Sequence, residues 1–138
     1  MRILIDTNIL ISASLSSTGT PYKAYIKAVT HPNHGMVCDQ NIDELRRVYN
    51  RKFPHKIQAL ERFLALSLTI LEVVPTPAVD IFNEALVRDV SDRPILRAAV
   101  QAKADILITG DKDFLESNVT NPKIMTAAEF LHWGKGNF

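Results

Sequence analysis

The stretch ADILITGDKDFL, residues 104–115, decides the fold. Its apolar run at residues 106–108 shows no alternation of polar and apolar side chains, which is typical of a strand buried on both faces of a sheet. This run ends in Thr109-Gly110-Asp111. The start of the chain has the same form, because residues 3–5 (Ile-Leu-Ile) lead directly into Asp6. The sequence therefore predicts two buried strands, each followed closely by an aspartate.

Three weaker strand candidates, at residues 36–38, 71–74 and 123–125, alternate with segments of helical periodicity. The apolar stripes of the predicted helices are Tyr22/Tyr25/Ile26/Val29, Ile42/Leu45/Val48/Tyr49, Ile57/Leu60/Phe63/Leu64/Leu68, Ile81/Phe82/Ala85/Leu86 and Ile95/Leu96/Ala99/Val100. Thr20 and Pro21 are expected as N-cap and first helical residue, and a capping box at Thr126 is expected to open a last helix. Residues 12–20 are expected to form a surface loop. Alternating strands and helices predict one α/β domain over residues 1–138, with a parallel sheet covered on both sides.

Composition excludes several classes of protein. The 138 residues include 16 Lys+Arg and 15 Asp+Glu, and this near-neutral balance excludes a protein that holds nucleic acid by bulk charge alone. The single cysteine, Cys38, excludes an internal disulfide and a CxxC zinc site. We expect no signal peptide, because Asp6 interrupts the first apolar run, and no membrane span, so the expected location is the cytoplasm.

The positions of the acidic residues are more informative than their number. Asp6 and Asp111 follow predicted strands, and ligands of open α/β sheets bind at the carboxyl ends of strands. Asp92 opens a predicted helix, and Glu44 lies at the margin of an apolar stripe. Each has a simpler explanation, namely an N-cap for Asp92, a turn for Asp111 and a solvated helix position for Glu44. If the four converge, their repulsion calls for a cation, and oxygen ligands favour Mg²⁺ or Mn²⁺ and phosphoester hydrolysis.

Four segments together resemble a PIN domain, most closely the VapC-like toxin components of bacterial toxin–antitoxin systems. They are Asp6-Thr7-Asn8, Asp43-Glu44-Leu45, DVSDRPIL at residues 89–96 and the stretch at residues 104–115, with TAAEFL at residues 126–131 completing the likeness. The resemblance implies a three-layer α/β/α sandwich around a parallel sheet of about five strands. It also implies a Mg²⁺- or Mn²⁺-dependent ribonuclease, an antitoxin protein as partner, and a homodimer.

The family's acidic quartet maps onto Asp6, Glu44, Asp92 and Asp111, with Asp113 as a fifth metal ligand. Asn8 and Thr109 resemble the polar residues that orient ligands or water in this family. Two positions leave alternatives open. Asp39 stands where related sequences usually carry Ser, and is either an N-cap or an additional charge at the site, while Asp89 lies close enough to compete with Asp92.

A basic stretch begins just after Glu44, and it supplies candidate contacts to RNA phosphates. The candidates are Arg46, Arg47, Arg51 and Lys52, together with Lys112 beside the acidic positions. Tyr49 and Phe53 either stack on unpaired bases or belong to the core.

Three other functions compete with the ribonuclease. A non-catalytic PIN-like module that binds RNA or protein is the strongest, although all four acidic positions are filled. A Mg²⁺-dependent phosphatase of the haloacid-dehalogenase type needs a second Asp two residues after the first, where this chain has Asn8. A receiver domain needs an early acidic pair and a late lysine at a strand end, and neither is evident.

Overall fold

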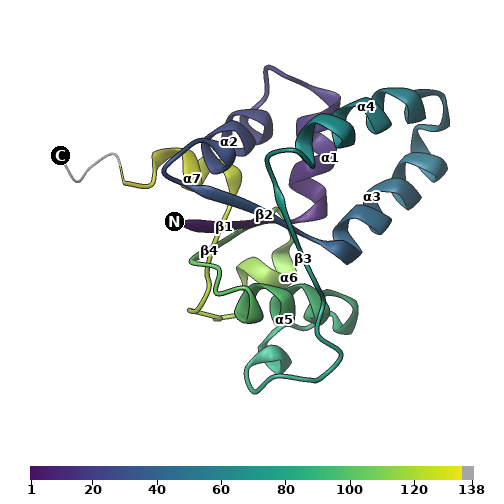
Figure 1. The fold of residues 1–138 in the computed structure, drawn as a ribbon. Coiled ribbons are helices and arrows are strands. Elements are labelled where there is room, and N and C mark those ends of the chain that lie inside the picture. The colour runs from purple at the N-terminus through teal and green to yellow at the C-terminus, as the bar shows by residue number, and fades with distance from the viewer. Residues whose placement is uncertain (135–138) are drawn as a thin grey trace.

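The computed structural model describes residues 1–134, and within them five strands form one parallel sheet in the order β3-β2-β1-β4-β5 (Figure 1). The strands are β1 (Arg2–Ile5), β2 (His34–Cys38), β3 (Glu72–Val74), β4 (Ile106–Ile108) and β5 (Lys123–Met125). The expected parallel sheet of about five strands is confirmed. From β1 the chain first builds β2 and β3 on one side, and later adds β4 and β5 on the other. The direction of winding therefore changes between β1 and β4.

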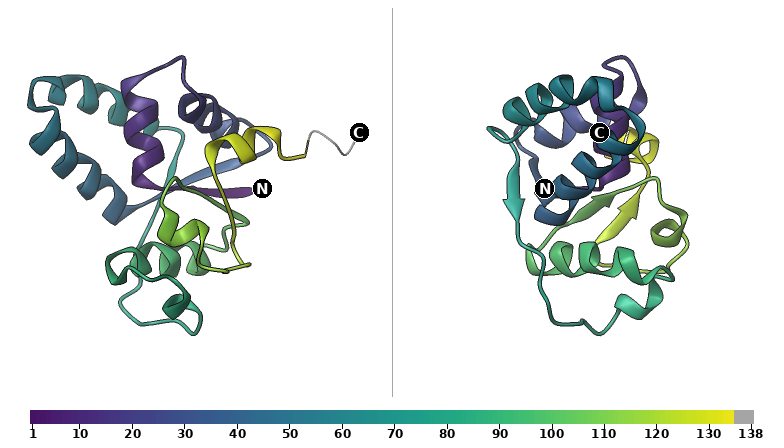
Figure 2. Two further views of the ribbon diagram at one scale, coloured as in Figure 1. Left: turned by 180° about the vertical axis from the view of Figure 1, so that it is seen from behind. Right: turned by 90° about the vertical axis from the view of Figure 1, so that its right-hand side faces the viewer.

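Helices cover both faces of the sheet, as the two views in Figure 2 show. They are α1 (Thr7–Leu15), α2 (Thr20–Val29), α3 (Asp39–Lys52), α4 (Ile57–Ser67), α5 (Arg93–Gln101), α6 (Lys112–Leu115) and α7 (Ala127–His132). Short 3-10 helices are η1 (Pro54–Lys56), η2 (Glu84–Leu86) and η3 (Val90–Asp92). The predicted three-layer α/β/α sandwich is confirmed.

Strands β1 and β4 supply apolar side chains to two separate cores. Ile3 and Ile5 of β1 pack beneath α1, α2, α3, α4 and α7, whereas Leu4 points to the opposite face and packs against α5 and α6. β4 repeats this pattern, with Ile106 and Ile108 on one face and Leu107 on the other. Since side chains alternate between the faces of a strand, a strand buried on both faces is apolar throughout. This explains why both strands could be predicted from short apolar runs.

One helix that the sequence predicted does not form. The predicted helix with the stripe Ile81/Phe82/Ala85/Leu86 is an irregular segment that contains only η2, and the Phe82 side chain is fully exposed (103%). The Glu84 carboxylate explains this geometry, because it accepts from Ile81 N at 2.9 Å and from Arg97 Nε at 2.7 Å. A tertiary ion pair thus fixes the segment instead of a helical apolar face.

The loop expected at residues 12–20 is shorter in the structure, because α1 extends to Leu15. The α2 N-cap is Gly19 rather than Thr20, which is itself the first helical residue. Pro21 still lies within the first turn, where its missing N–H costs no hydrogen bond.

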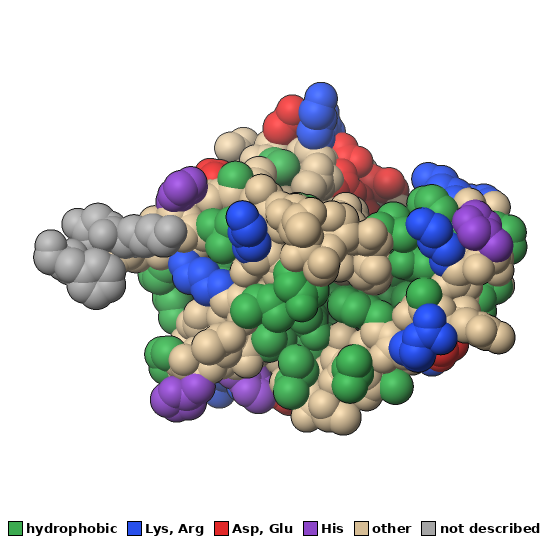
Figure 3. Space-filling model, turned by 90° about the horizontal axis from the view of Figure 1, so that it is seen from above, with side chains coloured by type: hydrophobic (Ala, Val, Ile, Leu, Met, Phe, Trp, Pro, Cys, Tyr) green, Lys and Arg blue, Asp and Glu red, His purple; other side chains and the backbone are tan. Residues whose placement is uncertain are grey.

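The surface carries several exposed apolar side chains. Ile26 of α2 and Leu66 of α4 are among them, and Figure 3 shows apolar side chains gathered on the face seen from above. None of the helices within residues 1–134 combines the length and apolar character that a membrane crossing requires.

Candidate functional site

Asp6 lies at the end of β1 with only 4% of its surface exposed, and four donors surround its carboxylate. Thr7 N (2.8 Å) and Asn41 Nδ2 (3.4 Å) donate to Oδ1, whereas Thr109 Oγ1 (2.8 Å) and Asn8 Nδ2 (3.2 Å) donate to Oδ2. Burial nevertheless raises the pKa of Asp6 to about 6, because the loss of hydration outweighs these hydrogen bonds. The site therefore contains a carboxylate of fixed orientation in a poorly hydrated position.

Glu44 is half-buried on α3, and a chain of polar contacts links it to Asp6. Thr7 Oγ1 donates to Glu44 Oε2 at 3.3 Å, while Asn41 Nδ2 donates to Thr7 Oγ1 at 2.7 Å. The Glu44 and Asp6 carboxylates are close enough for Glu44 to contribute to the raised pKa of Asp6. The marginal position of Glu44 on the apolar stripe thus turns its side chain toward the end of the sheet.

Thr109 and Asn8 join the ends of β4 and β1. Thr109 is fully buried, and its hydroxyl donates to Asp6 while accepting from Asp111 N at 3.0 Å. The Asn8 amide donates to Asp6 and accepts from Gly110 N at 2.8 Å. Both residues therefore contact the Asp6 carboxylate, and the orienting role that the family resemblance implied for them stays a prediction.

Asp111 caps helix α6 and also lies among the acids of the candidate site. As the N-cap of α6 it accepts from Asp113 N at 2.9 Å, so the turn explanation is correct. Its carboxyl also contributes to the raised pKa values of Asp6 and Asp92, so it lies in the same charge cluster.

Asp92 is the N-cap residue of α5, but its side chain makes no capping hydrogen bond. Burial and the neighbouring Asp111 carboxyl raise the pKa of Asp92 to about 8, with smaller contributions from Asp89 and Asp6. Within residues 1–134, Asp92 Oδ2 is the buried side-chain oxygen that has no hydrogen-bond partner. A cap does not explain this geometry, because a capping carboxylate would accept from the first turn of the helix.

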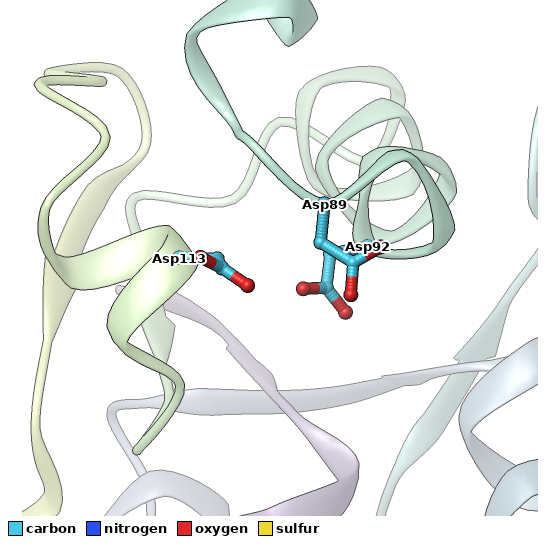
Figure 4. Close-up of side chains that lie close together, drawn as sticks. All are labelled: Asp89, Asp92 and Asp113. Atoms are coloured by element: carbon cyan, nitrogen blue, oxygen red, sulfur yellow. The ribbon is translucent and has the colours of Figure 1, made fainter.

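Asp89 and Asp113 lie beside Asp92, and the three side chains face one another in Figure 4. One carboxylate oxygen of each lies within 4.8 Å of those of the other two. Asp89 accepts from Ser91 N at 3.0 Å, and this hydrogen bond lowers its pKa. Asp113 forms an ion pair with Arg88 at 3.0 Å. Asp89 and Asp92 are thus neighbours in one acidic group.

Asp39 is held by a different set of contacts. Its carboxylate accepts from Thr76 Oγ1 at 2.5 Å and from Gln40 N at 2.8 Å, and the Thr76 contact is the main cause of its lowered pKa. The N-cap of α3 is Cys38, and Asp39 is the first helical residue. Asp39 is therefore not the N-cap that the sequence allowed. Its main contact is to Thr76, in the segment that follows β3.

A cleft of about 550 Å³ opens beside the carboxylates. Its lining residues are Gln40, Asp43, Glu44, Arg47, Val48, Arg51, Ser91, Asp92 and Ile95. The two arginines and two of the predicted acids, Glu44 and Asp92, therefore line the same cleft. This arrangement places positive charge along α3 and negative charge at the end of the sheet.

The other predicted phosphate contacts do not line the cleft. Arg46 is paired with Glu61, with Nε 3.0 Å from Oε1, and this bridge raises the pKa of Arg46. Lys52 and Lys112 are exposed at the last residue of α3 and the first of α6.

The two aromatic residues of this stretch belong to the core. Tyr49 is buried, and its ring centroid lies 5.5 Å from that of Phe53. Of the two alternatives for them, packing in the core is correct.

The donor set fits a hard divalent cation. It consists of carboxylate oxygens, which Mg²⁺ and Mn²⁺ prefer, and the described residues of the site contribute no histidine or cysteine ligand. Burial, followed by the neighbouring acids, raises the pKa values of Asp6 and Asp92, and Asp92 Oδ2 has no hydrogen-bond partner, so a cation placed among these oxygens would meet carboxylates that favour it.

Sequence reasoning missed two functional residues, Thr7 and Asn41. Both are buried and connect Asp6 to Glu44. A signal was available for Asn41, because it precedes Glu44 by three positions and so lies on the same helical face.

Comparison with known proteins identifies the class of protein to which this fold and site belong. The family model for the PIN domain matches residues 2–113. The chain therefore belongs to the PIN domain family, a family of nucleases. This confirms the family that the sequence motifs indicated.

Two similar proteins extend the comparison. The uncharacterized protein MJ1680 of Methanocaldococcus jannaschii is 26% identical over 145 residues, which cover 95% of this chain and 90% of that protein. The crystal structure of VapBC2 from Rickettsia felis, bound to a DNA fragment from its promoter, contains a chain of the same fold. That chain matches with a TM-score of 0.66 and 20% identity over 90% of this chain and 97% of its own length.

Proposed function

We propose that this PIN domain, spanning residues 1–138, is an endoribonuclease that uses Mg²⁺ or Mn²⁺ to hydrolyse phosphodiester bonds of single-stranded or structured RNA. The observation that carries the proposal is the buried, unpartnered Oδ2 of Asp92, whose pKa is raised to about 8 by burial and by the neighbouring acids. A purely structural role does not account for such a carboxylate, because leaving it without a partner costs free energy. A divalent cation would remove that cost.

The ion would be held by Asp6, Glu44, Asp92 and Asp111, with Asp113 as a further ligand. When bound, it supplies electrostatic stabilisation of the phosphate and lowers the pKa of an attacking water. The chain's own contribution is orientation. Thr109, Asn8 and Asn41 hold both oxygens of Asp6, and Thr7 holds Glu44, so these two carboxylates need no rearrangement when the substrate arrives.

Arg47 and Arg51 are the phosphate contacts that the cleft supports best, because both line it beside Glu44 and Asp92. Lys52 and Lys112 would contact phosphates farther from the reacting bond. Arg46 would contribute least, since its guanidinium is already paired with Glu61. The resulting RNA affinity depends on salt.

We further propose that the protein is the toxin of a toxin–antitoxin pair in the cytoplasm, that it forms a homodimer, and that a protein antitoxin is its partner. The VapBC2 structure, a toxin–antitoxin complex of the same fold, supports this assignment. Light scattering on the purified protein, alone and co-expressed with the product of a neighbouring short reading frame, tests the dimer and the partner.

Asp6→Asn tests the nuclease. We expect it to abolish Mg²⁺- or Mn²⁺-dependent cleavage of single-stranded RNA without unfolding the protein, because the amide keeps the shape of the side chain but loses its charge. Asp105→Asn is a matched control, because Asp105 directly precedes β4 at the other edge of the sheet and is exposed. Full activity of Asp6→Asn, or equal activity of the wild type in excess chelator, contradicts the proposal.

A further inference from the structure

A second hollow adjoins the acidic site on the side of α1 and α7. It has a volume of about 360 Å³ and is lined by Asn8, Ile9, Ser12, Thr20, Pro21, Thr109, Gly110, Thr126, Ala127 and Ala128. We call it the α1/α7 pocket. It shares no lining residue with the arginine-containing cleft. Asn8 connects it to the carboxylates, because its amide donates to Asp6 and accepts from Gly110 N.

The chemistry of the α1/α7 pocket differs from that of the cleft. None of its lining residues carries a charge, and the buried side chains of Ile9 and Ala127 form part of an apolar wall. Within residues 1–134, the exposed hydroxyls of Ser12 and Thr20 make no hydrogen bond and so are available to a ligand. Such a lining suits a flat, uncharged ring with polar edges, and it offers no cationic side chain to a phosphate.

We propose that the α1/α7 pocket binds one unpaired nucleoside of the RNA, next to the phosphate that is cleaved. This inference rests on the proposed ribonuclease function. A strand whose phosphates follow Arg47 and Arg51 into the site must continue beyond the carboxylates, and this pocket adjoins them through Asn8 and Thr109. A volume of about 360 Å³ is near the lower end of the roughly 300–1,000 Å³ typical of small-molecule sites, so the pocket has room for one nucleoside.

Base pairing is incompatible with this arrangement. A base in a duplex is stacked and paired, whereas recognition of RNA bases in pockets uses unpaired, splayed nucleotides. The proposal therefore narrows the substrate to RNA that is single-stranded at the cleaved bond.

Truncated substrates test the pocket with the wild-type protein alone. The bond cleaved in a 12-nucleotide single-stranded RNA is first mapped, and the chain is then shortened from each end until the phosphate carries only a methyl ester. On one side of the bond, removing the adjacent nucleoside should lower kcat/KM by about tenfold, which corresponds to about 1.4 kcal/mol of lost transition-state binding. A second nucleoside on that side should add little. Equal rates for all truncations on both sides overturn the proposal.

Filling the pocket tests the same inference from the protein side. Ser12→Trp and Ala128→Trp enter it from opposite walls, both at exposed positions. Each should lower kcat/KM about tenfold on the long RNA and have no effect on the RNA truncated at the pocket's side, because the two changes remove the same interaction. Ser17→Trp, in the loop after α1, is the matched control and should cleave both substrates normally.

The outcomes separate the subsite from the ribonuclease function. If the wild type cleaves RNA and both tryptophan variants cleave it equally well, the subsite is wrong and the ribonuclease function stands. If the variants lose activity equally on long and truncated RNA, the loss is general and the subsite is again wrong. A wild type that cleaves no RNA overturns the proposed function, and the subsite with it.

Discussion

Asp6 and Asp92 lie in the same acidic site but are held in opposite ways. Asp6 follows an inner strand of the sheet, and donors from Thr7, Asn8, Asn41 and Thr109 fix its carboxylate. Asp92 lies where η3 meets α5, and one of its oxygens is buried without a partner. The pKa of each is raised, to about 6 and about 8.

This difference suggests that Asp6 and Asp92 contribute to the site in different ways. A carboxylate with four donors keeps its position whether or not a cation is present, so in the proposed site Asp6 would define where the cation lies. A cation, like a proton, would relieve the electrostatic cost at Asp92, so in the proposed site Asp92 would couple the start of α5 to metal binding. Positioning residues therefore matter most around Asp6, and the charge itself matters most at Asp92.

Apart from the loss of cleavage expected for Asp6→Asn, the largest effect is expected from Asp92→Asn. Loss of this carboxylate should lower kcat/KM by more than the roughly 100-fold that loss of an outer-shell partner typically costs, because it removes a direct ligand. Asp89→Asn is the matched variant three residues earlier, and Ser91 already satisfies its carboxylate. It should cost less than tenfold by the same scale. Steady-state kinetics over a Mn²⁺ series measure both, and equal losses would erase the distinction between the two acids.

The pH dependence of stability sharpens the comparison. In metal-free protein, the folded Asp6 carboxyl keeps its proton up to a pKa of about 6, whereas the unfolded chain releases it near 3.8. The folded state thus binds more protons in this interval, and the free energy of unfolding falls as pH rises through it. By pH 7 the loss attributable to Asp6 is about 3 kcal/mol.

Urea unfolding between pH 4 and 7 in chelator measures this loss. The free energy of unfolding of Asp6→Asn should fall less between pH 4 and 7 than that of the wild type, by about 3 kcal/mol. Added Mg²⁺ at pH 7 should stabilise the wild type and not the variant. Parallel profiles for the two proteins would mean that burial does not control the ionisation of Asp6.

The sequence predicted the parts of the molecule that depend on local pattern. Ile3-Leu4-Ile5 and the run at residues 106–108 are apolar on both faces, so their strands and the acids after them could be found directly. Glu84 shows where this reasoning fails. Its ion pair with Arg97, thirteen residues away, replaces the helix that the nearby apolar spacing predicted, and it lowers the Glu84 pKa to about 2.

The candidate site shows the same limit. Asp6, Glu44, Asp92 and Asp111 followed from motif positions, but the role of Asn41 depends on Asp6, 35 residues away. Likewise, only the folded chain shows that Glu61 occupies Arg46 while Arg47, the next residue, lines the cleft. Contacts between distant segments decide these roles, and adjacent residues of one type can have different ones.

The smallest effect is expected at the arginines of α3. Arg47→Ala combined with Arg51→Ala should weaken RNA binding, and the slope of log K against log salt should become shallower by about 1.4, since each phosphate contact to a single strand contributes about 0.7. Arg46→Ala should leave the slope unchanged, because Glu61 already pairs with Arg46. Fluorescence anisotropy in the Asp6→Asn background keeps the RNA intact. An unchanged slope in the double variant would show that the RNA phosphates do not bind in the cleft. A shallower slope in Arg46→Ala would mean that RNA displaces Glu61 from Arg46.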